Sequence, residues 1–529
     1  MKINKLFSIL LACAFAAMLV SCSVKDPDEL LQTADEEYVT FVCDMASDAT
    51  KTAISDAGST PTPIWQAGDG IFIRPETSLM FSTYVTLTSA DINPADQSRA
   101  TFRIKTASTS TYYDALYPSS AFTTEEGYPA QLVATVPPAQ KGTFGSGHVA
   151  ASRSVPSTAG TYGFFFSNIT NFIEFTLDSD DYSRIVLKGN DDEIIAGPVQ
   201  LDLSGDKPAF TRYESSTFHG STDVSLDISG HSGKTYYIGI IPTDFEYGFT
   251  LLFYKAGSRT ADGEIAVSKR ADFSGTSKIY DLGLIDGKIT KALPEGALRG
   301  RFSVSDTRQV YFSCGNLVYT TLTGLWSFKE PQYDVPREGE VSTEEITLHC
   351  WGYDDEKSTD PYGQYTIPKD GQFSDKYDWG WALQPSDPWR TPSYGDWEYL
   401  FNTRTMTYGK PRYTKTAWDL VKIDDIAANG IFIYPDDFNG KPVDDSDANW
   451  TWSGLKNAGI VFLPENGIRE GDHYINAGGR QYYGGYWTSL DYTDNYAYAM
   501  KFNTNSGPFM DGLNRKDEGF GVRLIVDCE

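Results

Sequence analysis

The chain has 529 residues, with 44 Lys and Arg against 71 Asp and Glu and a formal net charge of −27. This length indicates three or four domains of roughly 150 residues each. Because the charge is strongly negative, a groove that follows nucleic-acid phosphates would oppose the protein's own field, and we expect no nucleic-acid partner. Aromatic residues make up 14% of the chain, and 47 glycines and 26 prolines punctuate it, which favours short β-strands joined by turns.

Residues 1–21 have the pattern of an export signal. Two lysines precede an apolar run from Leu6 to Val20, which is too short and wrongly flanked for a membrane-spanning helix. Small residues then precede Cys22, an arrangement that resembles a bacterial lipobox. The resemblance implies that Cys22 is acylated, for example with palmitate, and becomes the first mature residue. The alternative is an ordinary signal peptide with a chance cysteine.

Residues 22–35 read as an acidic tether. The run from Ser23 to Glu29 resembles the tag that directs lipoproteins of Bacteroides-like bacteria to the outer face of the cell. A flexible tether accounts for the same run. We therefore expect a surface-exposed protein that is anchored in the cell outer membrane by lipid and does not span it.

The next two stretches, residues 36–165 and 166–290, each predict a β-sandwich domain. Short apolar or alternating runs end at turn residues in both, and no long amphipathic helix interrupts them. The predicted strands are residues 38–42, 70–73, 100–104 and 112–117 in the first domain, and 171–177, 183–187, 234–240 and 248–254 in the second.

Ordered short motifs in these two domains carry a family resemblance. They are Thr50-Lys51-Thr52, the segment from Trp65 to Ile71, Leu116-Tyr117-Pro118, Val136 to Gln140, Phe164 to Asn168, Ile185 to Gly189 and Ala196-Gly197-Pro198. Together they resemble the fimbrillin-like (Mfa-like) pilus proteins of Bacteroidales over residues 36–290. The resemblance implies a fimbrial subunit that is exported as a lipoprotein and assembles by strand exchange.

Strand exchange needs no catalytic side chain. A sheet that lacks its first strand gains main-chain hydrogen bonds when a neighbour's strand fills the groove. In the family an Arg-specific protease removes that strand, yet the first arginine after the export signal is Arg74, inside a predicted strand. Only Lys25 and Lys51 precede it among basic residues after Cys22. Either another protease acts, or the subunit keeps its lipid and is not a stalk unit.

A different domain follows the linker at residues 291–298. Ten of the eleven tryptophans, all except Trp65, lie between Trp326 and Trp487, which indicates a separate core in residues 299–529. A strand at residues 309–317 and a capped helix at residues 389–401 begin the predicted pattern. The predicted closing strands are residues 459–464, 485–489, 496–502 and 521–526.

The order of these segments resembles the C-type-lectin-like fold, in the variant shared with formylglycine-generating and major paralogous domains of Bacteroidetes. The resemblance implies an α+β head after the two β-domains. Formylglycine chemistry needs a close pair of reactive cysteines, whereas Cys314, Cys350 and Cys528 lie in separate segments. The sugar-site motif of calcium-dependent lectins is also absent. We therefore expect no enzyme and no lectin of that calcium type.

The head contains a candidate metal site and a candidate disulfide. An oxygen-rich loop is a candidate calcium site, although a solvated acidic loop fits it better, and no other cofactor is expected. Cys314 and Cys528 lie on the predicted first and last strands, so a disulfide joins them if these strands are neighbours; inert buried thiols are the alternative. The candidate metal ligands are Asp436, Asp437, Asp444, Asp445 and Asp447.

Aromatic and polar residues in two loop segments form the candidate ligand site. Aromatic faces stack on sugar rings or anchor peptides, and neighbouring amides and charges orient the ligand. The alternative is that these aromatic residues belong to the core, as we expect for Trp452 and Trp487. The candidates are Tyr434, Trp450, His473, Tyr474, Asn476, Arg480, Tyr482 and Tyr483.

The sequence thus predicts a surface lipoprotein with two fimbrillin-like β-domains and a C-type-lectin-like head. A head at the C-terminal end occupies the place of a stalk subunit's donor strand, which favours a fimbrial tip position. The expected partners are other pilus subunits and a glycan or protein ligand. The alternative is a free-standing glycan-binding lipoprotein that never enters pili.

Overall fold

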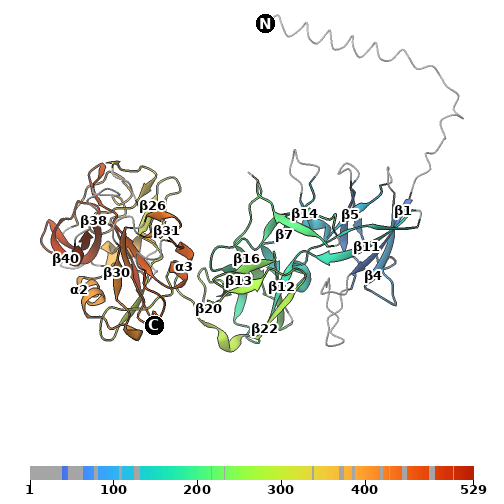
Figure 1. The fold of residues 1–529 in the computed structure, drawn as a ribbon, viewed down its shortest axis with the longest axis horizontal. Helices are drawn as coiled ribbons and strands as arrows, with labels where there is room; N and C mark the ends of the chain where they lie inside the picture. The colour runs from blue at the N-terminus through green and yellow to red at the C-terminus, as the bar shows by residue number, and fades with distance from the viewer. Residues whose placement is uncertain are drawn as a thin grey trace, which may run out of the picture. The chain divides into compact units, whose positions relative to one another are not determined.

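The computed structural model describes residues 38–45, 64–76, 82–105, 110–123, 131–158, 160–205, 207–215, 217–231, 233–335, 339–367, 375–383, 388–416, 421–427, 429–443, 449–475, 483–503 and 506–528. The predicted export signal, Cys22 and the acidic tether lie outside these residues. The described chain is mostly β (Figure 1), as predicted. It contains no helix that is long and apolar enough to cross a membrane.

The chain divides into two compact units. The first contains the described parts of residues 1–132, 150–167 and 202–209, and the second contains those of 133–149, 168–201 and 210–529. The two units therefore do not meet at a single boundary near residue 165, because each is built from several segments of the chain. Residues 133–149, expected in the first domain, belong to the second unit because two short strands there pair with strands from residues 197–227.

The first unit is built on one eight-stranded sheet with the order β3-β2-β5-β9-β11-β1-β4, in which β10 also pairs with β11. Its strands are β1 (Tyr38–Met45), β2 (Gly70–Pro75), β3 (Thr83–Thr86), β4 (Arg99–Lys105), β5 (Tyr113–Tyr117), β9 (Ala150–Arg153), β10 (Val155–Thr158) and β11 (Thr161–Asn168); the 3-10 turn η3 (Ser119–Ala121) and β6 (Phe122–Thr123) follow β5.

Strands near both edges of this sheet contribute to one core. Ile71 and Ile73 of β2 share one core with Phe102 of β4, although β2 and β4 lie near opposite edges of the sheet. Sheets of this width twist and curl, because each strand turns relative to the last. Side chains from distant strands of the sheet thus meet in one core, and the β-sandwich stays a prediction.

The second unit begins with the β-rich segment that the sequence predicted as a second β-domain. Its largest sheet has the order β23-β20-β19-β13-β16-β8, and smaller sheets include β17-β12-β22 and β18-β21. The strands are β7 (Val133–Val136), β8 (Ala139–Lys141), β12 (Asn171–Thr176), β13 (Tyr182–Gly189), β14 (Gly197–Asp202), β15 (Ala209–Arg212), β16 (Asp223–Asp227), β17 (Thr235–Ile240), β18 (Thr243–Phe245), β19 (Phe249–Lys255), β20 (Gly263–Val267), β21 (Ala271–Phe273), β22 (Ile279–Leu284) and β23 (Thr290–Lys291); η4 (Phe144–Ser146) and η5 (Asp286–Lys288) are 3-10 turns.

Residues 299–529, called the head below, belong to the same second unit, and their described part contains several core clusters. Their assignment to a separate domain stays a prediction. Six three-stranded sheets build the head: β24-β25-β41, β27-β26-β29, β28-β37-β36, β30-β33-β35, β32-β31-β34 and β38-β39-β40.

The strands of the head are β24 (Phe302–Ser303), β25 (Gln309–Phe312), β26 (Leu317–Thr320), β27 (Leu325–Phe328), β28 (Gly339–Glu340), β29 (Glu345–Ile346), β30 (Tyr413–Lys415), β31 (Lys422–Ile423), β32 (Ile426–Ala427), β33 (Gly430–Ile433), β34 (Asn449–Trp450), β35 (Val461–Pro464), β36 (Ile468–Glu470), β37 (His473–Ile475), β38 (Tyr483–Asp491), β39 (Tyr496–Asn503), β40 (Ser506–Arg515) and β41 (Ile525–Asp527). Its helices are α2 (Tyr394–Glu398) and α3 (Trp452–Asn457), with helical turns η6 (Asp375–Tyr377), η7 (Trp379–Ala382), η8 (Tyr399–Thr403) and η9 (Thr407–Gly409).

The predicted helix at residues 389–401 is shorter than expected, but its capping signal is correct. Ser393 and Asp396 form a capping box at the start of α2. The two side chains satisfy main-chain groups that the first helical turn would otherwise leave unpaired. Trp397 and Leu400 enter the head's core, as their spacing predicted.

Strand β1 joins the first unit together. It pairs in parallel with β11 and antiparallel with β4, and its alternate residues Val39, Phe41, Cys43 and Met45 are buried. This period of two places every second side chain in the core. β1 is thus an interior strand of the sheet, although it is the first described segment of the chain.

We predict that Phe41→Ala destabilises the first unit by about 3–5 kcal/mol, because it empties a fully buried ring site. Hydrogen exchange under rising urea, read on peptides of β4 and β11, measures this free energy. Tyr38→Ala at the exposed start of β1 is the control and should cost less than about 1 kcal/mol. Equal losses in both variants would contradict the inward packing of Phe41.

Candidate functional site

The position of β1 is the first candidate functional site, and Phe41 is its centre. The Phe41 ring lies 5.1 Å from that of Phe164 and 5.2 Å from that of Tyr113. It also lies 5.8 Å from each of the Phe102 and Tyr162 rings. Aromatic contacts at these centroid distances stabilise beyond the burial of surface alone. If β1 left, the sheet would therefore retain an aromatic groove.

Strand β4 depends on β1 for its attachment. β4 is the last strand of the sheet, and β1 is its neighbour in the strand order. Seven residue pairs, from Tyr38 opposite Lys105 to Asp44 opposite Arg99, define this ladder. Removal of β1 would expose main-chain groups on both β11 and β4, and unpaired strand edges readily accept another strand. The site is thus suited to replacement of β1 by another strand rather than to its simple loss.

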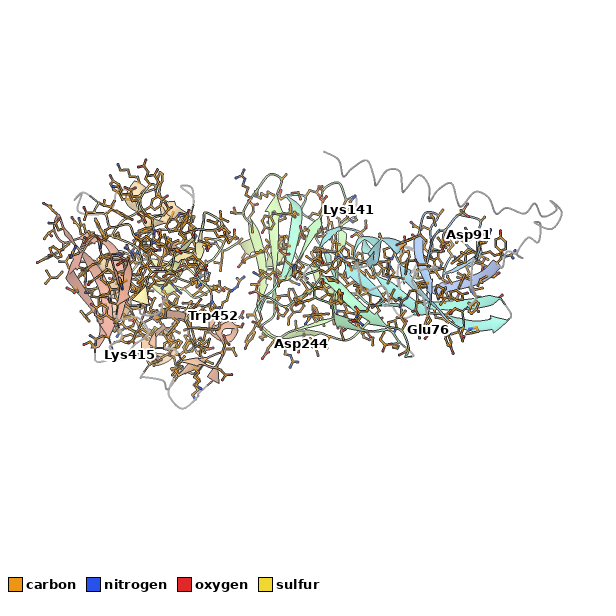
Figure 2. All side chains as sticks on the ribbon, turned by 90° about the horizontal axis from the view of Figure 1, so that it is seen from above. Glu76, Asp91, Lys141, Asp244, Lys415 and Trp452 are labelled. Carbon is orange, nitrogen blue, oxygen red and sulfur yellow. The ribbon has the colours of Figure 1, made fainter. Side chains whose placement is uncertain are left out.

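Arg74, the first arginine after the export signal, is not accessible to a protease in this fold. It lies in β2 and is 7% exposed, with its guanidinium 3.3 Å from the Asp114 carboxylate. Asp114 also binds Arg153 at 2.8 Å, and Arg153 binds Glu76 at 2.8 Å. Glu76 is labelled in Figure 2. The expectation that Arg74 lies within a strand is confirmed.

Two of the predicted ligand contacts, Tyr434 and Tyr474, are wrong because both side chains belong to the interior. Tyr434 is fully buried, stacks on Phe438 and donates its hydroxyl hydrogen to Thr414 Oγ1 at 2.8 Å. Tyr474 is 3% exposed and lies in β37, the middle strand of its sheet. The core alternative is correct for these residues, as it is for Trp452 and Trp487.

The other predicted ligand residues do not form one described cluster. Trp450 is partly buried against the head's core, His473 is exposed beside Asp472, and Tyr483 is half-buried beneath Lys501. These three residues lie on β34, β37 and β38, which belong to three different sheets. The remaining candidates Asn476, Arg480 and Tyr482 lie outside the described residues.

Asp436, predicted as a calcium ligand, is instead an acceptor of hydrogen bonds within the protein. Its Oδ2 accepts from the main-chain N–H of Ser303 at 2.9 Å and from Gln309 Nε2 at 2.8 Å. Its Oδ1 lies 3.2 Å from the guanidinium of Arg404, which has no exposed surface. A carboxylate with these partners compensates a buried cation and is not free for calcium. Within the described residues no cluster of three metal-ligating side chains occurs.

The other members of the acidic loop give no described site. Asp437 is exposed next to Asp436. Asp444, Asp445 and Asp447 lie outside the described residues, so calcium binding there stays a prediction.

We predict that Asp436→Asn lowers the free energy of unfolding of the head by about 3 kcal/mol, because it leaves the Arg404 charge buried without its counterion. Urea unfolding followed by tryptophan fluorescence measures this change, since ten of the eleven tryptophans belong to the head. Asp437→Asn is the control and should have little effect. A calcium-dependent stability that Asp436→Asn abolishes would contradict the structural role.

The predicted Cys314–Cys528 disulfide is wrong, although the two strands are neighbours as required. Both cysteines are free thiols. β25 and β41 pair antiparallel, and the main-chain N–H of Cys528 bonds to the carbonyl of Gln309 at 2.8 Å. Cys314 follows Gln309 by five residues, about 16 Å along an extended chain. A disulfide needs Cα atoms within about 7 Å, so the register of this ladder separates the thiols.

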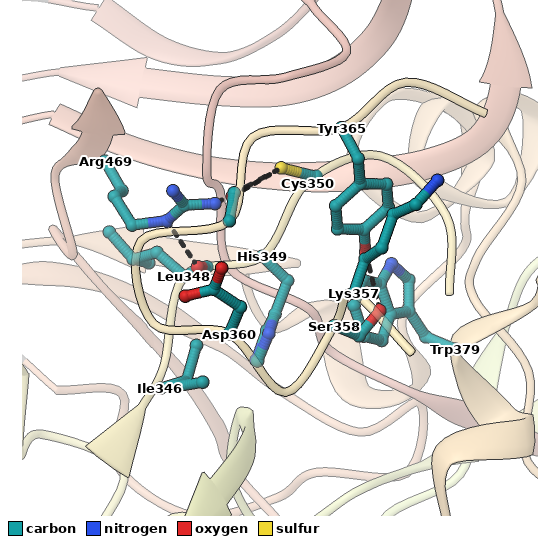
Figure 3. Close-up of a pocket in the computed structure, with 11 residues that line it drawn as sticks. Ile346, Leu348, His349, Cys350, Lys357, Ser358, Asp360, Tyr365, Trp379 and Arg469 are labelled. Carbon is teal, nitrogen blue, oxygen red and sulfur yellow. Dashed lines mark hydrogen bonds between the residues drawn. The ribbon is translucent and has the colours of Figure 1, made fainter. Parts of the chain in front are cut away.

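A small cavity lies beside Cys350 in the head (Figure 3), and its chemistry is unsuited to catalysis. The cavity has a volume of about 10 Å³, roughly the space of one water molecule. Burial raises the pKa of the Cys350 thiol, although Arg469 lies 3.2 Å from its sulfur. Burial lowers the pKa of His349 to about 3. A protonated thiol and a neutral imidazole in so small a cavity hold no substrate.

Glu465 is a buried acid at the end of β35. It is 5% exposed, and burial raises its pKa to about 7, while Lys415 acts in the opposite direction. Because the folded pKa lies above the ordinary value of 4.5, the folded state binds more protons than the unfolded state between these values. The contribution of Glu465 to stability is therefore present below about pH 4.5 and is lost as the pH rises through 7.

We predict that Glu465→Gln stabilises the head by about 2 kcal/mol at pH 8 and has little effect at pH 4.5. Tryptophan-detected urea unfolding across this pH range measures the effect. The control Glu470→Gln, at an exposed position nearby, should follow the wild type at every pH. The raised pKa of Glu465 would be contradicted if the free energy of unfolding of the wild type rose from pH 5 to pH 8 in parallel with that of Glu465→Gln.

One exposed aromatic group was missed by the sequence interpretation. Tyr492 is 48% exposed and Tyr496 is 36% exposed, at the turn between β38 and β39. The signal was present in the alternation from Tyr496 to Ala499, in which two tyrosines face one side of the strand and two buried alanines face the other. When small residues point into the core and aromatic residues point the other way, the aromatic residues belong to the surface rather than to the core.

Comparison with known proteins gives no family assignment. No protein-family model and no curated protein matches the chain. A candidate cell adhesion protein from Bacteroides ovatus is 12% identical, with 48% of this chain and 96% of that chain covered and a TM-score of 0.29. The tip fimbrial protein Mfa3 from Porphyromonas gingivalis, with a C-terminal truncation, is 9% identical, with 49% and 96% covered and a TM-score of 0.22.

A fimbrial protein from Bacteroides ovatus is 10% identical, with 92% of this chain and 99% of that chain covered and a TM-score of 0.22. TM-scores of 0.29 and below do not establish a shared fold. The function proposed below therefore depends on the residues and contacts of this chain.

Proposed function

We propose that the chain is a surface-exposed lipoprotein that acts as a fimbrial tip subunit and mediates adhesion through its head. The single observation that supports this most directly is the position of β1. It is the first described strand, yet it lies between β4 and β11 with Phe41 packed among four aromatic rings. A terminal strand of this kind is the element that a neighbouring subunit can replace.

Replacement of β1 is energetically reasonable because the incoming strand would recover the same two kinds of interaction. It would pair its main chain with β4 and β11, and its alternate apolar side chains would fill the sites of Val39, Phe41 and Met45. Full burial of each such side chain contributes roughly 1.5–3 kcal/mol. A donated strand with the same alternation therefore binds without a catalytic step.

The rest of the proposal follows from the sequence motifs. The two β-rich segments are of the fimbrillin-like type, and the head is an α+β domain of the C-type-lectin-like type. A head of this type is suited to contact a ligand, which favours a place at the tip over one in the stalk. Acylation at Cys22 supplies the anchor in the outer membrane before assembly. The partners are other pilus subunits and a host or bacterial ligand of the head.

Immunogold electron microscopy with an antibody against residues 299–529 tests the tip position. We expect gold particles at fibre ends, because a tip subunit occupies only the end of the polymer. An antibody against the stalk subunit is the control and should label the whole length. Uniform labelling along the fibres by the head antibody would contradict a tip role.

A second function is favoured by the burial of Arg74. Because this first arginine is buried against Asp114, an Arg-specific protease cannot release β1 from the folded unit by cleaving there. A chain that keeps β1 would remain a free-standing, lipid-anchored ligand-binding protein. Deletion of the stalk subunit distinguishes the two functions. A tip subunit would then disappear from the fibre fraction, whereas the amount of a free-standing protein on the cell surface would not change.

A further inference from the structure

Three tyrosines of the head, the half-buried Tyr394 and Tyr498 and the exposed Tyr492, form an ordered cluster centred on the Tyr498 ring. The Tyr498 ring lies 5.0 Å from the Tyr394 ring at 77° and 5.3 Å from the Tyr492 ring at 78°. Tyr394 belongs to α2, and this helix packs against β39, which carries Tyr498. Edge-to-face contacts at these distances hold rings in fixed orientations. The cluster is thus an ordered surface and not a set of independent side chains.

Gly512 on β40 provides the space for two of these rings. A Cβ atom at this position would lie 2.8 Å from Tyr498 Cε1 and 3.0 Å from Tyr492 Cγ. The ladder is irregular at the same place, because Ala497 faces Asn514 while Ala499 faces Asp511. Two residues of β40 therefore oppose the single residue Tyr498, which is a β-bulge. Bulges redirect side chains, and this one leaves space for the two aromatic rings.

The turn that carries Tyr492 is held by the main chain of Tyr496. The N–H groups of Tyr492 and Thr493 both donate to the carbonyl of Tyr496, at 2.8 and 2.9 Å. Tyr492 and Tyr496 remain 48% and 36% exposed in this arrangement. Since the backbone is fixed and a tyrosine side chain has few rotatable bonds, contact with a ligand costs little conformational entropy.

Arg515, the cation opposite Tyr496 on the neighbouring strand, is already bound to a carboxylate. Arg515 pairs with Tyr496 across the ladder, but its guanidinium binds the Asp517 carboxylate through Nε at 3.0 Å and Nη2 at 2.6 Å. On the side of Tyr394, burial and then the Glu398 carboxylate raise the pKa of the Tyr394 hydroxyl. The rim therefore offers donors and acceptors without net positive charge, on a chain of net charge −27.

We propose that Tyr394, Tyr492, Tyr496 and Tyr498 form a binding platform for neutral glycans. Sugar rings present apolar C–H faces to aromatic rings and uncharged hydroxyl groups to polar neighbours, and the platform offers both. This inference rests on the proposed function, because it names the ligand class of the adhesive head and locates its site on the β38-β39-β40 sheet.

The size of the platform favours a glycan over a protein partner. The exposed parts of Tyr492 and Tyr496 amount to on the order of 200 Å². A stable protein interface buries about 800 Å² on each partner. An anionic ligand is disfavoured because Glu398 and the overall negative charge repel it. A short neutral oligosaccharide matches both the area and the charge.

Binding of the full mature chain to arrays of neutral oligosaccharides, and of their sialylated and sulfated forms, tests the platform. We expect binding to neutral glycans, a loss of at least tenfold in affinity in Tyr492→Ala, and retained binding in Tyr492→Phe, which keeps the ring. Gly512→Ala should also weaken binding because its methyl group displaces two rings. Tyr362→Ala is the matched control, since Tyr362 is 49% exposed elsewhere in the head.

Three results would overturn the inference. They are no binding of the wild type to any neutral glycan, preferential binding to sialylated or sulfated forms, and wild-type affinity in Tyr492→Ala with an unchanged tryptophan spectrum. A cell-adhesion assay distinguishes failure of the glycan platform from failure of the proposed adhesive function. Adhesion that needs the head but survives Tyr492→Ala refutes the platform and leaves the adhesive role. Glycan binding by a chain absent from fibres refutes only the tip role.

Discussion

The first unit depends on the insertion of one strand between two others. β1 supplies the parallel ladder to β11, the antiparallel ladder to β4 and the ring of Phe41 at the centre of the aromatic core. Without it the sheet is left with two unpaired edges and an empty apolar groove, so the unit is complete only when some strand occupies this place. That constraint explains why an N-terminal strand with no catalytic chemistry is the most informative element for function.

Ion pairs in which at least one partner is buried stabilise the head in a comparable way. Asp396 caps α2 and also binds the guanidinium groups of Arg308 and Arg390. Asp436 holds Arg404 in the interior and binds the main chain of Ser303. Removing one partner of such a pair leaves an uncompensated buried charge, which is costly. Acidic residues in the head thus position the core on which the exposed tyrosines of β39 rest.

The sequence predicted local structure well wherever the local pattern determines it. The alternation in β1, the strands around Phe172 and Ile185, and the cap at Ser393 are all observed, because period and capping depend on neighbouring residues. The sequence interpretation was wrong where the register of a strand pair or long-range packing determines the position of a side chain. Cys314 and Cys528 lie on adjacent strands but far apart along them, and Tyr434 turns inward under Phe438. The platform around Tyr498 needed the bulge at Gly512, which no local pattern indicates.

The central claim is that a neighbouring subunit's strand takes the place of β1 in the assembled fibre. Mass spectrometry of the chain recovered from purified fimbriae measures this directly, because it identifies the first residue of the assembled form. The account predicts a chain that begins after Met45 and a partner peptide that cross-links to β4 and β11. A fibre-borne chain that retains Tyr38 to Met45, with these residues still protected from hydrogen exchange, would contradict it.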